Sequence, residues 1–178
     1  MREKLHMKIS ILLFVPFLLF AFSVVELTPV DADDAVTFNI KNFGINTKGS
    51  FKGLKGTIKW NPENPASSSF NVSVDVNTIN TGIELRDKDL QKENYFNAAK
   101  YPTISFVSTS VAANNVTGDL TIKGVTKQIT IPFTVTPSGN GYLFQGNFSI
   151  SRKEFGVGGG SVVLSDHVDV SLKVQANP

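Results

Sequence analysis

Apolar and polar residues alternate in short runs along most of the chain from residue 35 onward. The run FNVSVDV, residues 70–76, has apolar residues at every second position and polar residues between them. A period of two is typical of antiparallel strands with one buried and one solvated face. Comparable runs are VTFNIKN (36–42), GTIKW (56–60), TISFVSTSV (103–111), VTGDLTI (116–122), ITIPFTV (129–135), YLFQGNFSI (142–150) and VDVSLKV (168–174).

Turn-forming segments separate these runs at intervals of roughly 8–12 residues. They are NPENP (61–65), AANN (112–115), KGVTK (123–127) and PSGNG (137–141). With a further strand that ends near Phe51, the pattern predicts eight or nine strands in a sandwich or a barrel. Pro132 interrupts a strong strand and cannot donate a ladder hydrogen bond, so it should mark an edge, a bulge or a bend.

One segment departs from this β pattern. The stretch ELRDKDL, residues 84–90, carries charged residues at helical spacing, and Thr81 with Glu84 three residues later resembles a capping box. Pro102 returns the chain to extended geometry. A short charged helix cannot be core, so we expect it across one end of the β structure or along its outside.

The inward face of the predicted strands mixes aromatic and small residues. Gly118 and Gly146 lie in line with six phenylalanines, which are Phe38, Phe70, Phe106, Phe133, Phe144 and Phe148. Large and small side chains on one face can pack a tapering core or leave a channel. A barrel of about eight strands has an interior that is either filled or holds one small ligand. The residues alone leave both alternatives open.

The first residues predict a secretory signal peptide. A basic start is followed by an uncharged apolar run of 17 residues, from Ile9 to Val25, which is marginal for a membrane-spanning helix. Cleavage after Ser23 or after Ala32 would leave small residues at the required positions, and the β pattern that starts after Ala32 favours the later site. We therefore expect a signal peptide over residues 1–32 and an exported, periplasmic or secreted barrel over residues 33–178. An uncleaved N-terminal anchor is the alternative.

Composition and charge narrow the function classes. The 178 residues suggest one domain, and the absence of cysteine excludes disulfides and thiolate metal sites. The net charge is +2 and the lysines are scattered, so no nucleic-acid partner is expected. His167 is the one histidine after the leader, and a triad with its neighbours Asp166 and Asp169 is geometrically poor because adjacent strand residues point to opposite faces. We expect no metal, no cofactor and no enzymatic activity.

Four segments, taken together, resemble the YceI-like family of exported lipid-binding proteins. They are FGINTKGSFKGLKGTIKW (43–60), VNTINTGIELRDKDLQKENYFNAAKYPTISFVST (76–109), VTGDLTIKGVTKQITIPF (116–133) and FSISRKEFGVGG (148–159), and the similarity covers roughly residues 36–175. The resemblance implies an extended eight-stranded antiparallel barrel, lipocalin-like in shape, with one short helix near its end. It also implies a bound polyisoprenoid chain, such as an isoprenoid quinone tail or a polyprenyl lipid, along the barrel axis.

The resemblance and the alternating pattern together suggest candidate site residues. The apolar channel lining would be Phe38, Phe70, Val72, Val74, Phe106, Phe133, Phe144 and Phe148. Tyr95 and Phe96 would frame the barrel end. Arg86 and Arg152 would each either contact a ligand head group or form a structural ion pair.

Two departures from the family concern the head group. The family often begins its first strand with a His-Ser pair and has histidine in the motif RDxHL, whereas this chain has Ala35-Val36-Thr37 and Asp89 there. If those histidines touch a head group, this chain binds a different one or binds less selectively. We expect a non-enzymatic carrier of a long isoprenoid lipid that contacts a membrane surface transiently, with monomer or homodimer left open. A small-molecule enzyme and a structural β module with a filled core are the alternatives.

Overall fold

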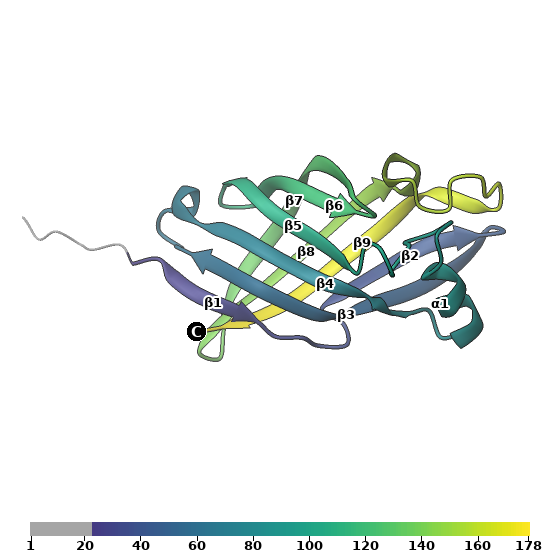
Figure 1. The fold of residues 1–178 in the computed structure, drawn as a ribbon. Coiled ribbons are helices and arrows are strands. Elements are labelled where there is room, and N and C mark those ends of the chain that lie inside the picture. Colours follow the sequence, from purple (N-terminus) through teal and green to yellow (C-terminus); the bar gives the residue numbers. More distant parts are fainter. Residues whose placement is uncertain (1–22) are drawn as a thin grey trace, which may run out of the picture.

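Nine antiparallel strands build a closed barrel with eight strand positions in the computed structural model, which describes residues 23–178 (Figure 1). The barrel closes in the order β3-β2-β9-β8-β7-β6-β5-β4 and back to β3. Strand β1 lies between β3 and β9, in line with β2, and continues the ladder past the first residue of β2. The short helix α1 lies at one end (Figure 1), so the predicted all-β, eight-stranded barrel with a helix near its end is confirmed. The strands are β1 Val25–Pro29, β2 Val36–Asn42, β3 Ile45–Trp60, β4 Ser69–Asn80, β5 Thr103–Val111, β6 Asn115–Ile122, β7 Val125–Ser138, β8 Gly141–Ser151 and β9 Leu164–Asn177, and the helices are α1 Glu84–Leu90 and the 3-10 turns η1 Pro65–Ser67 and η2 Arg152–Phe155.

Strand β1 belongs to the barrel although the sequence pattern assigned it to the leader. It pairs with β3 from Val25 and with β9 up to Pro29, beyond the end of β2. Leu27 is completely buried. The run VELTP is only five residues long and directly follows the apolar leader, so the alternation of apolar and polar residues within it is not recognisable in the sequence. The barrel thus begins before residue 33, while residues 1–22 of the predicted signal peptide lie outside the described part of the chain.

Strand β3 is one continuous strand of 16 residues, where the sequence predicts two short runs. Glycines and lysines in KGSFKGLKG conceal the alternation, and the ladder with β4 shifts register twice along this stretch. Gly56 has a φ of +130°, and a Cβ there would lie 2.1 Å from the carbonyl oxygen of Asn71. Glycine is therefore required for the close approach of the two strands, and the bulges let the long strand bend around the barrel.

Pro132 lies where the β7–β8 ladder stops. Phe133 donates its N–H to the carbonyl of Asn114 on the β6 side, so an N–H at Pro132 would have pointed toward β8. Pairing of β7 with β8 accordingly runs from Phe133 to Ser138, whereas pairing with β6 extends from Pro132 to Val125. The predicted edge position of this proline is confirmed on its β8 side.

Helix α1 is joined to the end of β4 by side chains, but not by the predicted capping box. No side chain caps the helix. Instead, the carboxylate of Asp87 accepts hydrogen bonds from the hydroxyl of Thr81 and from its backbone N–H, the latter at 2.9 Å. Arg86 donates from Nε to Oγ1 of Thr81 and from Nη2 to its carbonyl oxygen, both at 2.7 Å. Within residues 23–178, no helix is long and apolar enough to cross a bilayer.

Candidate functional site

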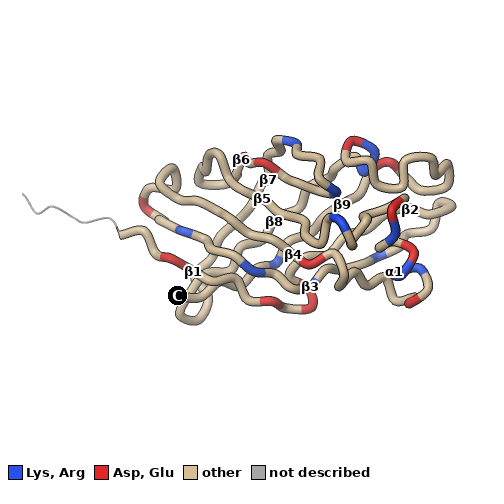
Figure 2. Tube along the Cα trace, viewed as in Figure 1, with Lys and Arg blue, Asp and Glu red and all other residues tan. Residues whose placement is uncertain are grey.

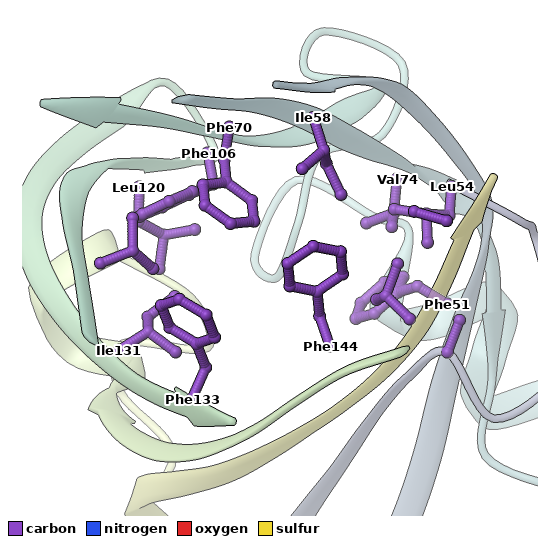
Figure 3. Close-up of a cluster of buried hydrophobic side chains, with 14 of the residues drawn as sticks. Phe51, Leu54, Ile58, Phe70, Val74, Phe106, Leu120, Ile131, Phe133 and Phe144 are labelled. Carbon is purple, nitrogen blue, oxygen red and sulfur yellow. The ribbon is translucent and has the colours of Figure 1, made fainter. Parts of the chain in front are cut away.

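An apolar cavity of about 270 Å³ runs through the interior of the barrel. All eight strands of the closed barrel contribute to its wall, and Figure 3 shows labelled apolar side chains that point inward from the surrounding strands. Phe38, Phe148 and Val170 line the cavity from the middle of the sheet and are only half-buried. A side chain flanked by strands on both sides keeps such exposure only when the space in front of it is empty. The barrel is therefore hollow rather than filled.

Aromatic rings close the cavity at the end opposite α1. Trp60, which is 2% exposed, contacts Phe133 and Phe144 with ring centroids 5.9 and 5.5 Å apart. Phe70 makes two further edge-to-face contacts with the same phenylalanines. Such pairs each add about 0.5–1.5 kcal/mol beyond the burial of their surface. These four rings form the apolar floor of the cavity.

The cavity extends to the α1 end, where its wall becomes partly polar. Phe96, which follows α1, packs edge-on against Phe51 at 5.6 Å, and Phe51 contacts Phe38 at 5.5 Å. Beyond these rings the lining includes Asn42 and Arg86, both half-buried. Oδ1 of Asn42 is buried and has no hydrogen-bond partner among the described residues. We call this end the mouth of the cavity.

All the site residues predicted from the sequence line this one cavity. The predicted apolar lining is Phe38, Phe70, Val72, Val74, Phe106, Phe133, Phe144 and Phe148, and the predicted barrel-end residues are Arg86, Tyr95, Phe96 and Arg152. Alternation was sufficient to find the apolar set because every second residue of a strand faces inward. Whether these residues contact a ligand stays a prediction.

Arg152 has a structural role in the loop that follows it. The side chain is 4% exposed, and it donates hydrogen bonds to the carbonyl oxygens of Val157, Gly158, Ser161, Leu164 and Ser165. One guanidinium nitrogen also lies 3.4 Å from the carboxylate of Asp166. Of the two predicted roles, Arg152 therefore has the structural one.

Arg86 is placed differently. Its hydrogen bonds go to Thr81, and no carboxylate of residues 23–178 lies within salt-bridge distance of its guanidinium. The ion pair that the sequence suggested for Arg86 does not form. Its charge lies at the mouth, which leaves the head-group role as a candidate.

The sequence pattern missed part of the cavity wall. Phe51 and Leu54 on β3, and Phe155 and Val157 around η2, are buried and line the cavity. The glycine-rich segment of β3 hides the first pair. The second pair lies outside the strands, where no period of two exists, and only the motif RKEFGV marked it.

The charged groups whose pKa is shifted lie outside the cavity. No group of three His, Cys, Asp or Glu side chains within residues 23–178 lies close enough to hold a metal ion. A hydrogen bond and the charge of Lys173 lower the pKa of Asp34, and Asp33 raises the pKa of Lys52 in the same two ways. None of these four residues lines the cavity. The lining is suited to excluding water around an apolar molecule.

Known proteins match the chain in sequence. A family model described as a YceI-like domain matches residues 28–176. A UPF0312 protein of Yersinia pestis (strain Pestoides F) is 34% identical over 151 residues, which cover 79% of each chain. A UPF0312 protein of Yersinia enterocolitica is 33% identical over 151 residues, with the same coverage of both chains.

Solved structures match the fold. BcnA of Burkholderia cenocepacia has a TM-score of 0.74 at 28% identity and covers 85% of this chain and 98% of its own. The YCEI protein of Campylobacter jejuni has a TM-score of 0.67 at 26% identity, with 75% and 86% covered. A polyisoprenoid binding domain of Saccharophagus degradans, described as implicated in plant cell wall breakdown, has a TM-score of 0.68 with 87% and 99% covered. Its identity is 18%, so this likeness concerns the fold alone.

Proposed function

Because the chain belongs to the YceI-like family, we propose that it is a non-enzymatic protein that carries an isoprenoid lipid inside its barrel. The observation that carries the proposal is the hollow cavity of about 270 Å³, with an apolar wall, a ring-lined floor and a polar mouth. A structural β module with a filled core does not account for that cavity. A polyisoprenoid binding domain has the same fold, so an isoprenoid is the first ligand to test.

Burial of hydrocarbon supplies the affinity in this proposal. Each five-carbon unit removed from water contributes about 4 kcal/mol, at roughly 0.8 kcal/mol per carbon. Association costs about 4–15 kcal/mol, so several units are needed for tight binding. An apolar cavity of about 150 Å³ holds a benzene-sized molecule, so 270 Å³ accommodates about two five-carbon units. A longer chain requires Phe51 and Phe96 to move aside or part of the lipid to project from the mouth.

The polar groups at the mouth suit a head group. Arg86 presents a positive charge there, and the side-chain amide of Asn42 lies at the same end of the lining. A head group with both an anionic or carbonyl oxygen and a hydroxyl would complement these two side chains. Quinones, prenols and prenyl phosphates differ in the carbonyl, hydroxyl and anionic oxygens that they carry, so mass spectrometry of the bound lipid has to identify the head group.

The proposal is tested by extraction of the purified protein with organic solvent and mass spectrometry of the extract. We expect an isoprenoid lipid to co-purify, and protein stripped of lipid to take up an added all-trans prenol from detergent solution. The same protein in guanidinium chloride is the control, because the unfolded chain has no cavity. A folded protein that yields no lipid and takes up no prenol would contradict the proposal.

We further propose that the chain is exported and that cleavage follows Ser23 rather than Ala32. Strand β1 supports the earlier site, because cleavage after Ala32 would remove the fully buried Leu27 and leave β3 and β9 without their partner at that end. Removal of a buried leucine side chain alone costs about 2–5 kcal/mol. The intact mass of the exported protein is expected to correspond to a chain that begins at Val24. A chain that begins at Asp33 would contradict this site, and a retained leader would contradict cleavage.

A further inference from the structure

The outermost tips of the barrel beside the mouth are apolar and exposed. Phe43 and Ile45, in the β2–β3 hairpin, are 74% and 71% exposed, and Val162, in the loop between η2 and β9, is 97% exposed. These two segments are neighbours, because Phe43 donates its N–H to the carbonyl of Val163 at 2.9 Å. We call Phe43, Ile45 and Val162 the apolar rim. Figure 2 shows both tips without charged residues, at the end of the molecule that carries α1.

Phe43 occupies a backbone position that does not favour it. Phe43 and Gly44 have φ angles of +51° and +76° between the paired residues Asn42 and Ile45, which is a two-residue hairpin turn with positive φ at both positions. Such turns prefer Asn-Gly, and a bulky residue at positive φ is an outlier. The β6–β7 hairpin has the same turn with a polar residue, Lys123, at the equivalent position. Because the ring of Phe43 is exposed, folding gains little from it, and another role explains its presence better.

The charge of the β2–β3 hairpin points to an anionic partner. Lys41 and Lys48 flank the tip of the hairpin and are exposed, and the sequence from Ala35 to Pro62 contains lysines but no acidic residue. No carboxylate of residues 23–178 lies within salt-bridge distance of either lysine. On α1 the lysines are instead paired with carboxylates of the same helix or its end, at 2.7 and 2.6 Å. Apolar side chains between unpaired lysines are typical of a segment that enters an anionic membrane interface.

We propose that the apolar rim docks the mouth of the cavity onto an anionic lipid bilayer. Phe43, Ile45 and Val162 enter the interface between head groups and acyl chains, while Lys41 and Lys48 contact the anionic head groups. This rests on the proposed function, since a lipid that leaves a bilayer for the cavity avoids water only where the mouth meets the membrane. The proposal adds which end of the barrel meets the membrane and which side chains hold it there.

Co-sedimentation with vesicles tests the rim. The protein, as purified after export, is mixed with vesicles of phosphatidylcholine that contain phosphatidylglycerol and no isoprenoid. The variant Phe43→Asn/Ile45→Thr has the residue that the turn prefers and keeps a β-branched residue in the strand, so its thermal midpoint should be unchanged or higher. We expect its vesicle affinity to fall by about tenfold or more, because two large apolar side chains no longer enter the interface. Val107→Thr, on the exposed outer wall of β5, is the matched control and should bind like the unmodified protein.

Substitution of the two lysines tests the electrostatic part of the proposal separately, because it should affect only binding to anionic vesicles. Lys41→Gln/Lys48→Gln should weaken binding to vesicles with phosphatidylglycerol and leave binding to pure phosphatidylcholine unchanged. Added salt should weaken the unmodified protein more than this variant, because salt screens exposed charges. If the Phe43→Asn/Ile45→Thr variant binds vesicles as well as the unmodified protein, the proposal is wrong. If the unmodified protein does not bind vesicles and the same substitutions convert a dimer to a monomer, the proposal is also wrong, and the rim is an interface with a second copy of the chain.

Loading from detergent separates this inference from the proposed function. The Phe43→Asn/Ile45→Thr variant should still take up a prenol from detergent solution, because its cavity is intact. Uptake from vesicles should be slower than for the unmodified protein. If no protein loads from detergent, the proposed function fails. If all load and the rim substitutions change neither vesicle binding nor uptake from vesicles, only the docking inference fails.

Discussion

The variant Val170→Trp is expected to lose isoprenoid uptake while the barrel stays folded. Val170 lies in β9 between Phe38 of β2 and Phe148 of β8, and its half-buried side chain faces the cavity. An indole ring at this position occupies space that is empty in the protein without ligand. Overpacking costs about 1–3 kcal/mol in a filled core, but here the added ring meets a void and recovers packing contacts. We therefore expect uptake to fall by more than about tenfold, with a thermal midpoint that is unchanged or higher.

The matched control places the same substitution on the outside of the barrel. Val107 is 45% exposed, and Val107→Trp should leave uptake unchanged. Uptake is measured by mass spectrometry of the lipid extracted after loading from detergent, and folding by thermal unfolding. If Val170→Trp folds and loads like the unmodified protein, the lipid does not occupy the barrel. If it unfolds, the interior has no free space at Val170, and the hollow cavity is contradicted.

The variant Arg152→Met is expected to lose about 3–5 kcal/mol of unfolding free energy. Methionine keeps the length and the apolar surface of the side chain but leaves the five carbonyl oxygens of the loop after η2 without their donor. Each buried carbonyl that loses its only partner costs about 1–3 kcal/mol, reduced where water replaces the donor. Arg152→Lys should recover little of the loss, because one ammonium cannot reproduce a planar fork of donors.

Lys153→Met is the control for Arg152→Met. Lys153 is the next residue, is exposed and forms an ion pair with Asp166 at 2.9 Å. Exposed ion pairs contribute about 0–1 kcal/mol, so this variant should unfold almost like the unmodified protein. Guanidinium denaturation measures both variants. An Arg152→Met variant as stable as Lys153→Met would contradict the structural role of Arg152.

The alternation of apolar residues predicted most of the strands, because antiparallel strands have a period of two in the sequence, but it left a sandwich and a barrel open. It failed where another constraint overrode that period. Gly56 interrupts the alternating pattern of β3 because the strand must approach Asn71 closely there, and the segment VELTP adjoins the apolar leader. Thr81 and Glu84 have the spacing of a capping box, yet Asp87 and Arg86 bind Thr81 instead. Side-chain competition of this kind leaves no periodic signal.

The candidate site was predictable in part for the same reason. Wall residues such as Phe106 and Phe144 follow from alternation, but the residues alone could not tell a filled barrel from a hollow one, because that depends on summed volumes in three dimensions. Phe155, which is 1% exposed, and Gly156, which has a φ of +66°, lie outside the strands, where alternation gives no signal. The sequence could not separate the roles of Arg86 and Arg152, because only the contacts in the structure distinguish them. Arg152 donates hydrogen bonds to five backbone carbonyls, whereas Arg86 lies at the mouth of the cavity.

The most direct test of an isoprenoid chain in the barrel is a crystal structure of the protein loaded with a polyprenol. The account predicts continuous electron density inside the barrel, with the polar end near Arg86 and Asn42 and the hydrocarbon end directed toward the rings of Phe133 and Phe144. Phe51 and Phe96 should move if the chain exceeds the cavity. Electron density for the polyprenol confined to the outer surface, with the interior of the barrel unchanged, would contradict the account.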